Sequence, residues 1–566
     1  MTTPETYADL GEAAWRWVLD QVRWDDDGPW IPESQVLGGG AHDGGPPEDR
    51  DGMHSGIGGL AHVLAEVRLA RQWTDEEAAL ADGMAERIRA GLATTTAYSY
   101  FDGLVSDLGV IAALETDGAE QAIARLAGLA TDDGWDQPWL APPYAPHSRI
   151  NDATLGTAGN LLGAVWSHRH GTPGAETLAA RAADILMAEA EPTEAGTNWL
   201  FVPRRFAVDV PPERRERQMP NWSHGLAGIA AALAVAGAQL DRPDLVDAAR
   251  RGAEHLVTLG DNADGGFVVP HVIPHQDDMD EVTYTWCHGP TGTSLLFTAL
   301  EHAGVDEVAG ETPAEWHRRC LHSIRTSGIP ERLRPGFWDN DGRCCGTAGV
   351  GDVFLDAWQR RGRDDDLAFA QVLGDALVGR AIVDGGRACW RFTEHRDEDP
   401  LLPPGVGWMQ GTAGIAAYLL RLARVLREGR TTPAVARLDT WWNVPRPQAS
   451  KRLRTESASR WASVLTWCAS SPSTMTRMTG SVPEARKITR PRPPSSDSTL
   501  PMASRTAASP VGSTGSRTFT FSSTCGNCSM PAASSLNERR VRCITASTWS
   551  AVIKPSPVVV QSRQIT

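Results

Sequence analysis

Three cysteines stand directly before glycines that open apolar, helix-like segments. Cys344 and Cys345 precede Gly346 in the stretch DGRCCGTAGVGD, and Cys287 lies two positions before Gly289 in TWCHGPTGT. Three thiolate ligands that leave a fourth position open are typical of a catalytic zinc site rather than a closed structural one. A single buried cysteine is usually an inert small residue, but three at matching places favour metal binding. We therefore expect Zn²⁺ bound by Cys287, Cys344 and Cys345.

Residues that can transfer protons occupy similar places in the chain. His224 immediately precedes Gly225, and His288 stands between Cys287 and its glycine. Histidine titrates near neutral pH and is the commonest general acid or base. Asp152 lies four residues before Gly156, where it can either orient a base or cap a helix. These residues share one site if the segments that follow them share one end of the fold.

A repeated pattern indicates which elements must position these side chains. A small residue, two further positions, a glycine and an apolar run recur seven times, starting at Gly56, Ser106, Gly156, Gly225, Gly289, Gly346 and Gly411. The intervals between these starts are 50, 50, 69, 64, 57 and 65 residues. A period near 60 residues with one such helix leaves room for a second helix and a loop, so the pattern predicts one helical hairpin in each unit.

The segments between the repeats differ from them in charge. Residues 75–92 and 243–260 are amphipathic, with arginine and glutamate on one side, as expected of outer helices that face solvent. The glycine-headed segments are nearly uncharged, as expected of helices buried on all sides. We predict an all-α fold, an α/α toroid of about seven helical hairpins over residues 1–440, with inner helix starts converging on a central cavity.

Charge and composition change abruptly at the end of this region. Residues 441–566 hold 17 Lys and Arg against 4 Asp and Glu, which leaves 37 and 66 of the chain totals of 54 and 70 for residues 1–440. The tail is therefore near +13 and the body near −29. Because the tail is rich in serine and threonine, we expect it to be disordered. One hypothesis is that it is an out-of-frame translation, which the coding DNA would test.

The same composition excludes several classes of protein. An acidic body lacks the clustered Lys and Arg that nucleic-acid binding needs, so no nucleic-acid partner is expected. The longest uncharged run, residues 221–240, is built from alanine and glycine and carries polar residues, which indicates a buried helix rather than a membrane span. No signal sequence is predicted at the N-terminus, and the five body cysteines show no disulfide spacing. We expect a cytoplasmic protein.

The motifs NWSHGLAGI, TWCHGPTGT and RCCGTAGVG resemble the signatures of the lanthionine synthetase C family, the cyclases of lantibiotic biosynthesis and their relatives. The resemblance covers residues from about 50 to 425 and includes the sevenfold repeat. It implies an α,α-toroid with zinc held by Cys287, Cys344 and Cys345, the last in a place where many relatives have histidine. Bacterial cyclases commonly carry an arginine shortly before the WC motif, whereas this chain has Thr283 and Tyr284 there.

The reaction that the resemblance implies is addition of a thiol to dehydroalanine or dehydrobutyrine, which forms a thioether. His224 resembles the acid/base histidine of the family, and Asp152 resembles an acidic residue of the bacterial cyclases, which would orient a base or protonate the enolate that sulfur addition leaves. His288 is expected to bond the carbonyl that becomes the enolate or to support the metal. The partners implied are a dehydrated peptide and possibly a small thiol such as glutathione, with a separate dehydratase to supply the substrate.

Two other functions remain open at this stage. A zinc-dependent binding protein would hold a thiol or a peptide without turnover. Carbohydrate-active enzymes also use α/α toroids, but they need paired carboxylates or histidines in the cavity rather than clustered cysteines.

Overall fold

The computed structural model of the chain describes residues 2–34, 49–137, 144–208, 218–276, 280–331, 340–393 and 401–443. Within these ranges lie fourteen α-helices, four two-stranded antiparallel sheets and three short 3₁₀ helices. The 3₁₀ helices are η1 (Ile57–Gly59), η2 (Arg204–Phe206) and η3 (Ala263–Gly265). The fold is an α/α toroid, as the repeat pattern predicts.

Seven helices form the inner ring. They are α2 (Leu60–Ala70), α4 (Leu104–Leu114), α6 (Thr157–Arg169), α9 (Leu226–Leu240), α11 (Pro290–His302), α13 (Thr347–Arg361) and α15 (Thr412–Glu428). Their sequences are mostly apolar and small, so they can be buried on every side. In α9, every residue from Leu226 to Gly237 is buried.

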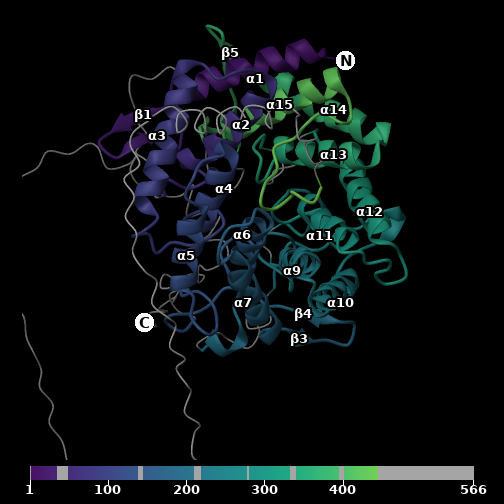
Figure 1. Cartoon of the computed structure of the whole chain (residues 1–566). Coiled ribbons are helices and arrows are strands. Elements are labelled where there is room, and N and C mark those ends of the chain that lie inside the picture. Colours follow the sequence, from purple (N-terminus) through teal and green to yellow (C-terminus); the bar gives the residue numbers. More distant parts are fainter. Residues whose placement is uncertain are drawn as a thin grey trace, which may run out of the picture. The chain divides into compact units, whose positions relative to one another are not determined.

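Seven further helices pack outside the inner ring, as the order of labels in Figure 1 shows. They are α1 (Pro4–Leu19), α3 (Asp75–Gly91), α5 (Ala119–Leu129), α7 (Ala175–Ala188), α10 (Pro243–Leu259), α12 (Pro313–Thr326) and α14 (Asp364–Arg380). In α10 the buried residues recur at three- and four-residue spacing, which leaves the opposite face to Arg and Glu. The two outer helices predicted over 75–92 and 243–260 are confirmed, each ending one residue earlier.

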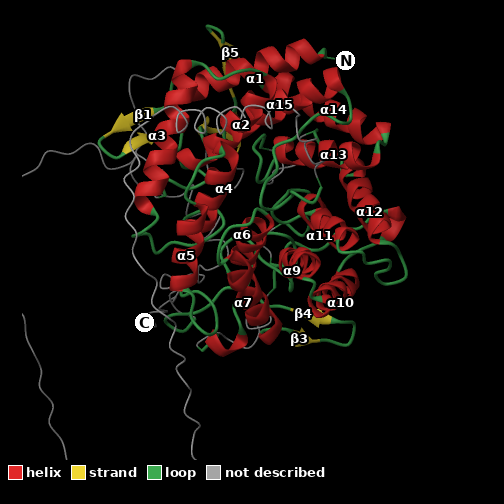
Figure 2. Cartoon of the chain, viewed as in Figure 1, coloured by secondary structure: helices red, strands yellow, loops and turns green. Residues whose placement is uncertain are grey.

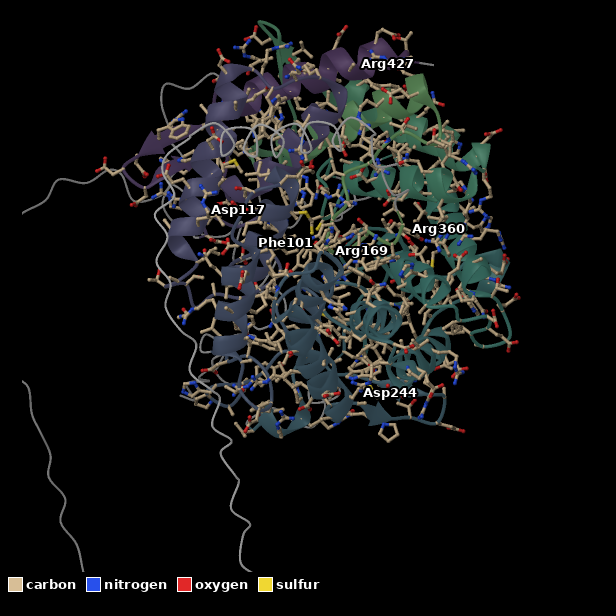
Figure 3. All side chains as sticks on the ribbon, in the orientation of Figure 1. Phe101, Asp117, Arg169, Asp244, Arg360 and Arg427 are labelled. Carbon is tan, nitrogen blue, oxygen red and sulfur yellow. The ribbon has the colours of Figure 1, made fainter. Side chains whose placement is uncertain are left out.

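The ring closes between the two ends of this region. Each inner helix pairs with the outer helix that follows it, except α15, which pairs with α1. Neighbouring inner helices contact one another from α13 through α15, α2, α4, α6 and α9 to α11. Charged side chains such as Asp244 and Arg427 lie at the periphery in Figure 3, whereas Phe101 lies toward the centre.

Each inner helix is entered through a seven-residue loop that ends at a glycine, with the 3₁₀ helix η1 between that glycine and the helix in the case of α2. These helix-entry loops are residues 50–56, 97–103, 150–156, 219–225, 283–289, 340–346 and 405–411. A Cβ on any of the seven final glycines would overlap the backbone of the residue six positions earlier; at Gly56 it would lie 2.6 Å from the carbonyl oxygen of Arg50. The glycines are therefore required because the loop folds back onto its own helix start.

The second repeat begins three residues earlier than its sequence pattern indicates. Helix α4 starts at Leu104 with Gly103 before it, so Ser106 lies inside the first turn rather than at the start. Ser106 takes the position of the second glycine in the other repeats, and its hydroxyl accepts a hydrogen bond from the Met53 backbone N–H at 2.9 Å. A serine is small enough for this crowded position, which is why the pattern could be read in the wrong register.

Short β-hairpins lie among the connections between helices, as Figure 2 shows for the labelled strands. They pair β1 (Arg23–Asp25) with β2 (Gly28–Trp30), β3 (Glu191–Pro192) with β4 (Thr197–Asn198), β5 (Ile382–Asp384) with β6 (Arg387–Cys389), and β7 (Arg391–Thr393) with β8 (Leu401–Pro404). No helix within the described ranges combines the length and the apolar character that crossing a bilayer requires.

After α15 the chain turns back along the inner helices. This return segment, residues 429–443, contacts several of them. The indole N–H of Trp442 donates to Thr298 Oγ1 of α11 at 3.1 Å, and the Arg169 guanidinium of α6 lies 4.3 Å from the ring centroid of Trp441. Arg360 of α13 donates to the carbonyl of Trp442 at 3.0 Å. Residues 441–443, the first three of the predicted tail, are thus buried, and residues 444–566 lie outside the described part of the chain.

Candidate metal centre

The three cysteines singled out above converge in the structure. Cys287 lies in the helix-entry loop of α11, and Cys344 and Cys345 lie in that of α13. Their three Sγ atoms are all within 4.8 Å of one another, and all three residues are buried. The Sγ atoms of Cys287 and Cys345 are 3.4 Å apart. Three thiols in one buried space form a group that can hold a metal ion.

The protonation of the three thiols is interdependent. Burial raises the pKa of Cys287, but hydrogen bonds from the thiols of Cys344 and Cys345 outweigh burial and hold its pKa well below the usual value. The pKa values of Cys344 and Cys345 are well above the usual value, first because both thiols bond Cys287. A thiolate on Cys287 therefore makes it unfavourable for Cys344 and Cys345 to lose their protons as well. A divalent cation removes that repulsion, so the donor set fits a metal such as zinc.

Backbone hydrogen bonds link the helix-entry loops around the ring. The bonds join Met53 N to Phe101 O, Tyr100 N to Thr154 O, Ser223 N to Cys287 O, Cys344 N to Met409 O, and Met409 N to His54 O, at 2.7–3.1 Å. Thr154 Oγ1 also lies 3.1 Å from Ser223 O. Between loops 283–289 and 340–346, both fully described, no such backbone bond is present, and the cysteine sulfurs meet there instead.

His224 and Asp152 form a hydrogen-bonded pair beside the cysteines. Nδ1 of His224 lies 2.6 Å from Oδ2 of Asp152, which is fully buried. The Asp152 carboxylate also accepts from the hydroxyl of Thr154 at 3.1 Å and from the backbone N–H of Leu155 at 2.7 Å. Since α6 begins at Thr157 after Gly156, Asp152 is not its N-cap, and its contact with His224 matches the orienting interpretation.

A row of three imidazoles extends from this pair. The ring centroids of His224 and His288 are 5.3 Å apart, and those of His288 and His271 are 4.4 Å apart. Burial lowers the pKa of His288 well below its usual value, although the negative charge of Cys287 opposes that shift. His288 is therefore neutral near pH 7. The predicted site residues Asp152, His224 and His288 thus form one connected group, and His288 directly follows Cys287 in the chain.

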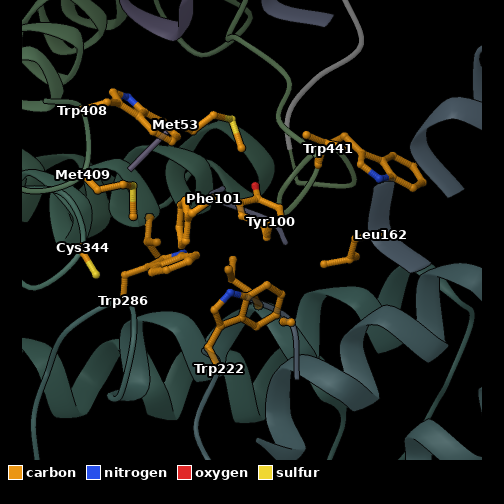
Figure 4. Packing of buried hydrophobic residues seen from close by; sticks show 14 of the residues in the cluster. Met53, Tyr100, Phe101, Leu162, Trp222, Trp286, Cys344, Trp408, Met409 and Trp441 are labelled. Carbon is orange, nitrogen blue, oxygen red and sulfur yellow. The ribbon is translucent and has the colours of Figure 1, made fainter. Parts of the chain in front are cut away.

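Aromatic side chains line the centre of the ring next to the cysteines. Figure 4 shows Trp222, Trp286, Phe101 and Met409 facing one another near Cys344. The ring centroids of Phe101 and Trp286 are 6.0 Å apart, and those of Trp222 and Trp286 are 6.3 Å apart. Trp222 and Trp286 come from the same loops as His224 and Cys287, so the loops that carry the polar groups also exclude water from them.

Two histidines near this centre are not among the residues selected from the sequence. His271 lies in an irregular segment between η3 and the α11 entry loop, where no pattern marks it. His54 lies two positions before Gly56. The sequence could have indicated it, because Cys287 and Cys344 stand at the same distance from their glycines. Thr283, one of two residues found where bacterial cyclases carry arginine, is buried and its hydroxyl lies 3.3 Å from that of Thr285.

The fold and the site together define a class: a helical toroid with a three-cysteine centre and an adjacent Asp–His pair at its inner helix starts. The chain belongs to the lanthionine synthetase C-like protein family, whose model matches residues 47–428.

Solved structures of several toroid proteins are similar to this chain. Nisin cyclase is 13% identical over 66% of this chain and 89% of its own, with a TM-score of 0.43. A sugar epimerase from a ruminal bacterium is 11% identical over 74% of this chain and 98% of its own, with a TM-score of 0.41. A glycoside hydrolase family 76 mannosidase from Bacteroides thetaiotaomicron is 11% identical over 75% and 99%, with a TM-score of 0.42. A comparison with curated proteins finds no match.

Proposed function

We propose that this protein is a zinc-dependent enzyme that adds a thiol to a dehydroalanine or dehydrobutyrine residue of a peptide and so forms a thioether. The observation that carries the proposal is the placement of three converging cysteines beside the Asp152–His224 pair in a chain of the lanthionine synthetase C-like family. We favour this function over a carbohydrate-active one because three thiols converge beside the row of imidazoles, and a carbohydrate-active site would not need them.

The residues assigned to the metal are Cys287, Cys344 and Cys345, which leave a fourth position for the substrate thiol. When bound, zinc would keep an incoming thiol in its thiolate form near neutral pH. The buried aromatic side chains around this position keep bulk water away from the substrate sulfur. The sulfur therefore keeps its nucleophilicity.

His224 is assigned the proton transfer to carbon. Attack of sulfur on the β-carbon consumes the double bond, forms the C–S bond and leaves an enolate whose α-carbon must gain a proton. The Asp152 carboxylate accepts a hydrogen bond from Nδ1 of His224 and so orients the imidazole, which leaves Nε2 for the substrate. His224 then delivers a proton from Nε2 to the α-carbon.

His288 is assigned to the substrate carbonyl. Burial keeps its imidazole neutral, and a neutral imidazole can donate one hydrogen bond to the oxygen on which negative charge develops. The contact between its ring and His271, with centroids 4.4 Å apart, restricts how that ring can turn. Thr283 carries no charge, so His288 takes the larger share of enolate stabilisation.

The substrate proposed is a dehydrated peptide, whose dehydro residues a separate dehydratase must supply, as in lantibiotic biosynthesis. The thiol donor is a cysteine of the same peptide or a small thiol such as glutathione. The experiment is to supply the zinc-loaded protein with a dehydroalanine peptide and each donor, and to follow thioether formation by mass spectrometry. Thioether formed above the uncatalysed rate supports the proposal. No turnover with either donor, despite full zinc loading, would favour a binding protein.

A further inference from the structure

Thr154 stands in the α6 entry loop at the place where two other entry loops carry a cysteine. It lies two positions before the final glycine of its loop, as Cys287 and Cys344 do in theirs. Its side chain is buried, and its backbone carbonyl accepts from the N–H of Tyr100 in the preceding entry loop at 2.9 Å. The position is therefore fixed by the backbone, and it directs a hydroxyl rather than a thiol toward the next entry loop.

The hydroxyl of Thr154 contacts both members of the Asp152–His224 pair. Its Oγ1 lies 3.1 Å from Oδ2 of Asp152, 3.2 Å from Nδ1 of His224 and 3.1 Å from the carbonyl oxygen of Ser223. A hydroxyl has one proton and two lone pairs. Because the carboxylate and the carbonyl can only accept, the proton of the hydroxyl goes to one of these two oxygens, and a lone pair remains for the N–H at Nδ1 of His224.

This bridge matters because the two members of the pair belong to different loops. Asp152 is held within the α6 entry loop, since its Oδ1 accepts from the backbone N–H of Leu155 at 2.7 Å. His224 belongs to the α9 entry loop, and its ring meets that of Phe201 edge-on, with centroids 5.5 Å apart and an angle of 82° between the planes. Thr154 joins the two loops at the nitrogen that the carboxylate binds, and it thereby restricts how the imidazole can turn.

We propose that Thr154 is a positioning residue, which holds the imidazole of His224 in the orientation that delivers a proton to one face of the substrate α-carbon. This inference rests on the proposed thiol addition. The thiol releases its proton to water, the C–S bond forms, and Nε2 of His224 protonates the α-carbon and later regains a proton from water. The planar α-carbon becomes a stereocentre in this step. A fixed proton donor therefore gives one configuration, whereas a donor that can turn gives both.

The test is Thr154→Val, which keeps the shape of the side chain but removes the hydroxyl. We expect enzyme-dependent thioether formation on a dehydroalanine peptide to slow by about 10- to 100-fold, with KM and zinc content unchanged. The product should contain both configurations at the new α-carbon, whereas the wild type gives one. Chiral chromatography of the hydrolysed product measures the ratio after subtraction of the uncatalysed product. Thr154→Ser, which keeps a hydroxyl, should restore a single configuration.

A second measurement needs no turnover. The N–H proton at Nδ1 of His224 is followed by NMR in the substrate-free protein and is assigned by its loss in His224→Asn. Loss of one hydrogen-bonding partner in Thr154→Val should speed its exchange with water by about tenfold. The matched control is Thr157→Val, since Thr157 is also buried but its hydroxyl donates to the carbonyl of Ile150 at 3.2 Å. It should keep both the wild-type exchange rate and a single configuration.

The outcomes separate this inference from the proposed function. A single configuration at the wild-type rate in Thr154→Val would overturn the positioning role, and so would unchanged exchange at Nδ1 of His224. Loss of zinc in Thr154→Val, or mixed configurations to the same extent in Thr157→Val, would also overturn it, because the effect would then be general loosening of the loop. Inactivity of the wild type with both thiol donors would refute the proposed function and this inference with it.

Discussion

Cys345 tests the assignment of the metal ligands at the scale of single residues. We expect Cys345→Ala to lose most of its zinc, because two thiolates and water hold this ion poorly. Cys320→Ala is the matched control, since Cys320 is also fully buried but lies on α12. Zinc is measured by elemental analysis after dialysis against a weak chelator. Stoichiometric zinc in Cys345→Ala would rule out this ligand set, whereas the control should keep the wild-type amount.

His224 tests the proton transfer to carbon. Replacing it by Asn should leave fold and zinc content intact and slow thioether formation by about 10² to 10⁴ for every thiol donor. The loss should not depend on thiol acidity, because protonation of the α-carbon follows attack by sulfur. His168→Asn, a change at the end of α6, serves as the control. Rates equal to those of the wild type would exclude this role for His224.

Residue types and spacing made much of the candidate site predictable. The positions of Cys287, Cys344 and His224 before helix-opening glycines indicate a shared cavity, because a helix start fixes where the preceding side chains lie. His271 could not be found in this way, since it reaches His288 from an irregular segment without periodicity. From the sequence, Asp152 could be a helix cap or a catalytic-site group. The start of α6 excludes the N-cap, and the orienting role stays a prediction that the contact with His224 supports.

At the scale of elements, the helix-entry loops explain the repeated glycines. The sequence pattern predicts the inner helices, and five of the seven begin directly after the first residue of their repeat; α2 begins after the 3₁₀ helix η1. The pattern misplaces the start of α4, because Ser106 substitutes for a glycine and Gly109 extends the apparent pattern. Neither the outer partner of α15 nor the loop-to-loop hydrogen bonds can be read from the sequence, since both depend on closure of the ring between distant segments.

The cysteines lie where the loop-to-loop bonds are interrupted, between the entry loops of α11 and α13. At the opposite helix ends, Arg361 of α13 and Glu301 of α11 form an ion pair at 2.6 Å. The metal would therefore join the two helices at their starts. Removing zinc with a chelator should speed amide hydrogen exchange in the first turns of α11 and α13 by at least about tenfold, or about 1.4 kcal/mol of local stability.

The first turns of α4 and α6 provide the internal reference for this exchange experiment. Their entry loops are joined by the bond from Tyr100 N to Thr154 O at 2.9 Å, which involves no metal. Exchange there should be unchanged by the chelator. Unchanged exchange at α11 and α13 in a protein shown to be metal-free would contradict a joining role of the metal.

At the scale of the whole described region, the return segment fills part of the ring interior. Trp442 is 6% exposed and contacts α11, and its ring centroid lies 6.5 Å from that of Trp222 beside the site. Trp442→Ala should lower the free energy of unfolding by about 3 to 5 kcal/mol, as other large-to-small core changes do. Denaturant unfolding measures this loss. Trp24→Ala, at a side chain that is 56% exposed, should change little, and equal midpoints for both variants would contradict the buried position of the segment.

The central claim is that three cysteines hold a zinc ion with one position open to the substrate thiol. X-ray absorption at the zinc edge of the zinc-loaded protein, recorded with and without a thiol donor, tests it most directly. We predict three sulfur neighbours at about 2.3 Å and one lighter atom, changing to four sulfur neighbours when the thiol is added. A metal shell with fewer than three sulfurs, or one that the thiol leaves unchanged, would contradict the account.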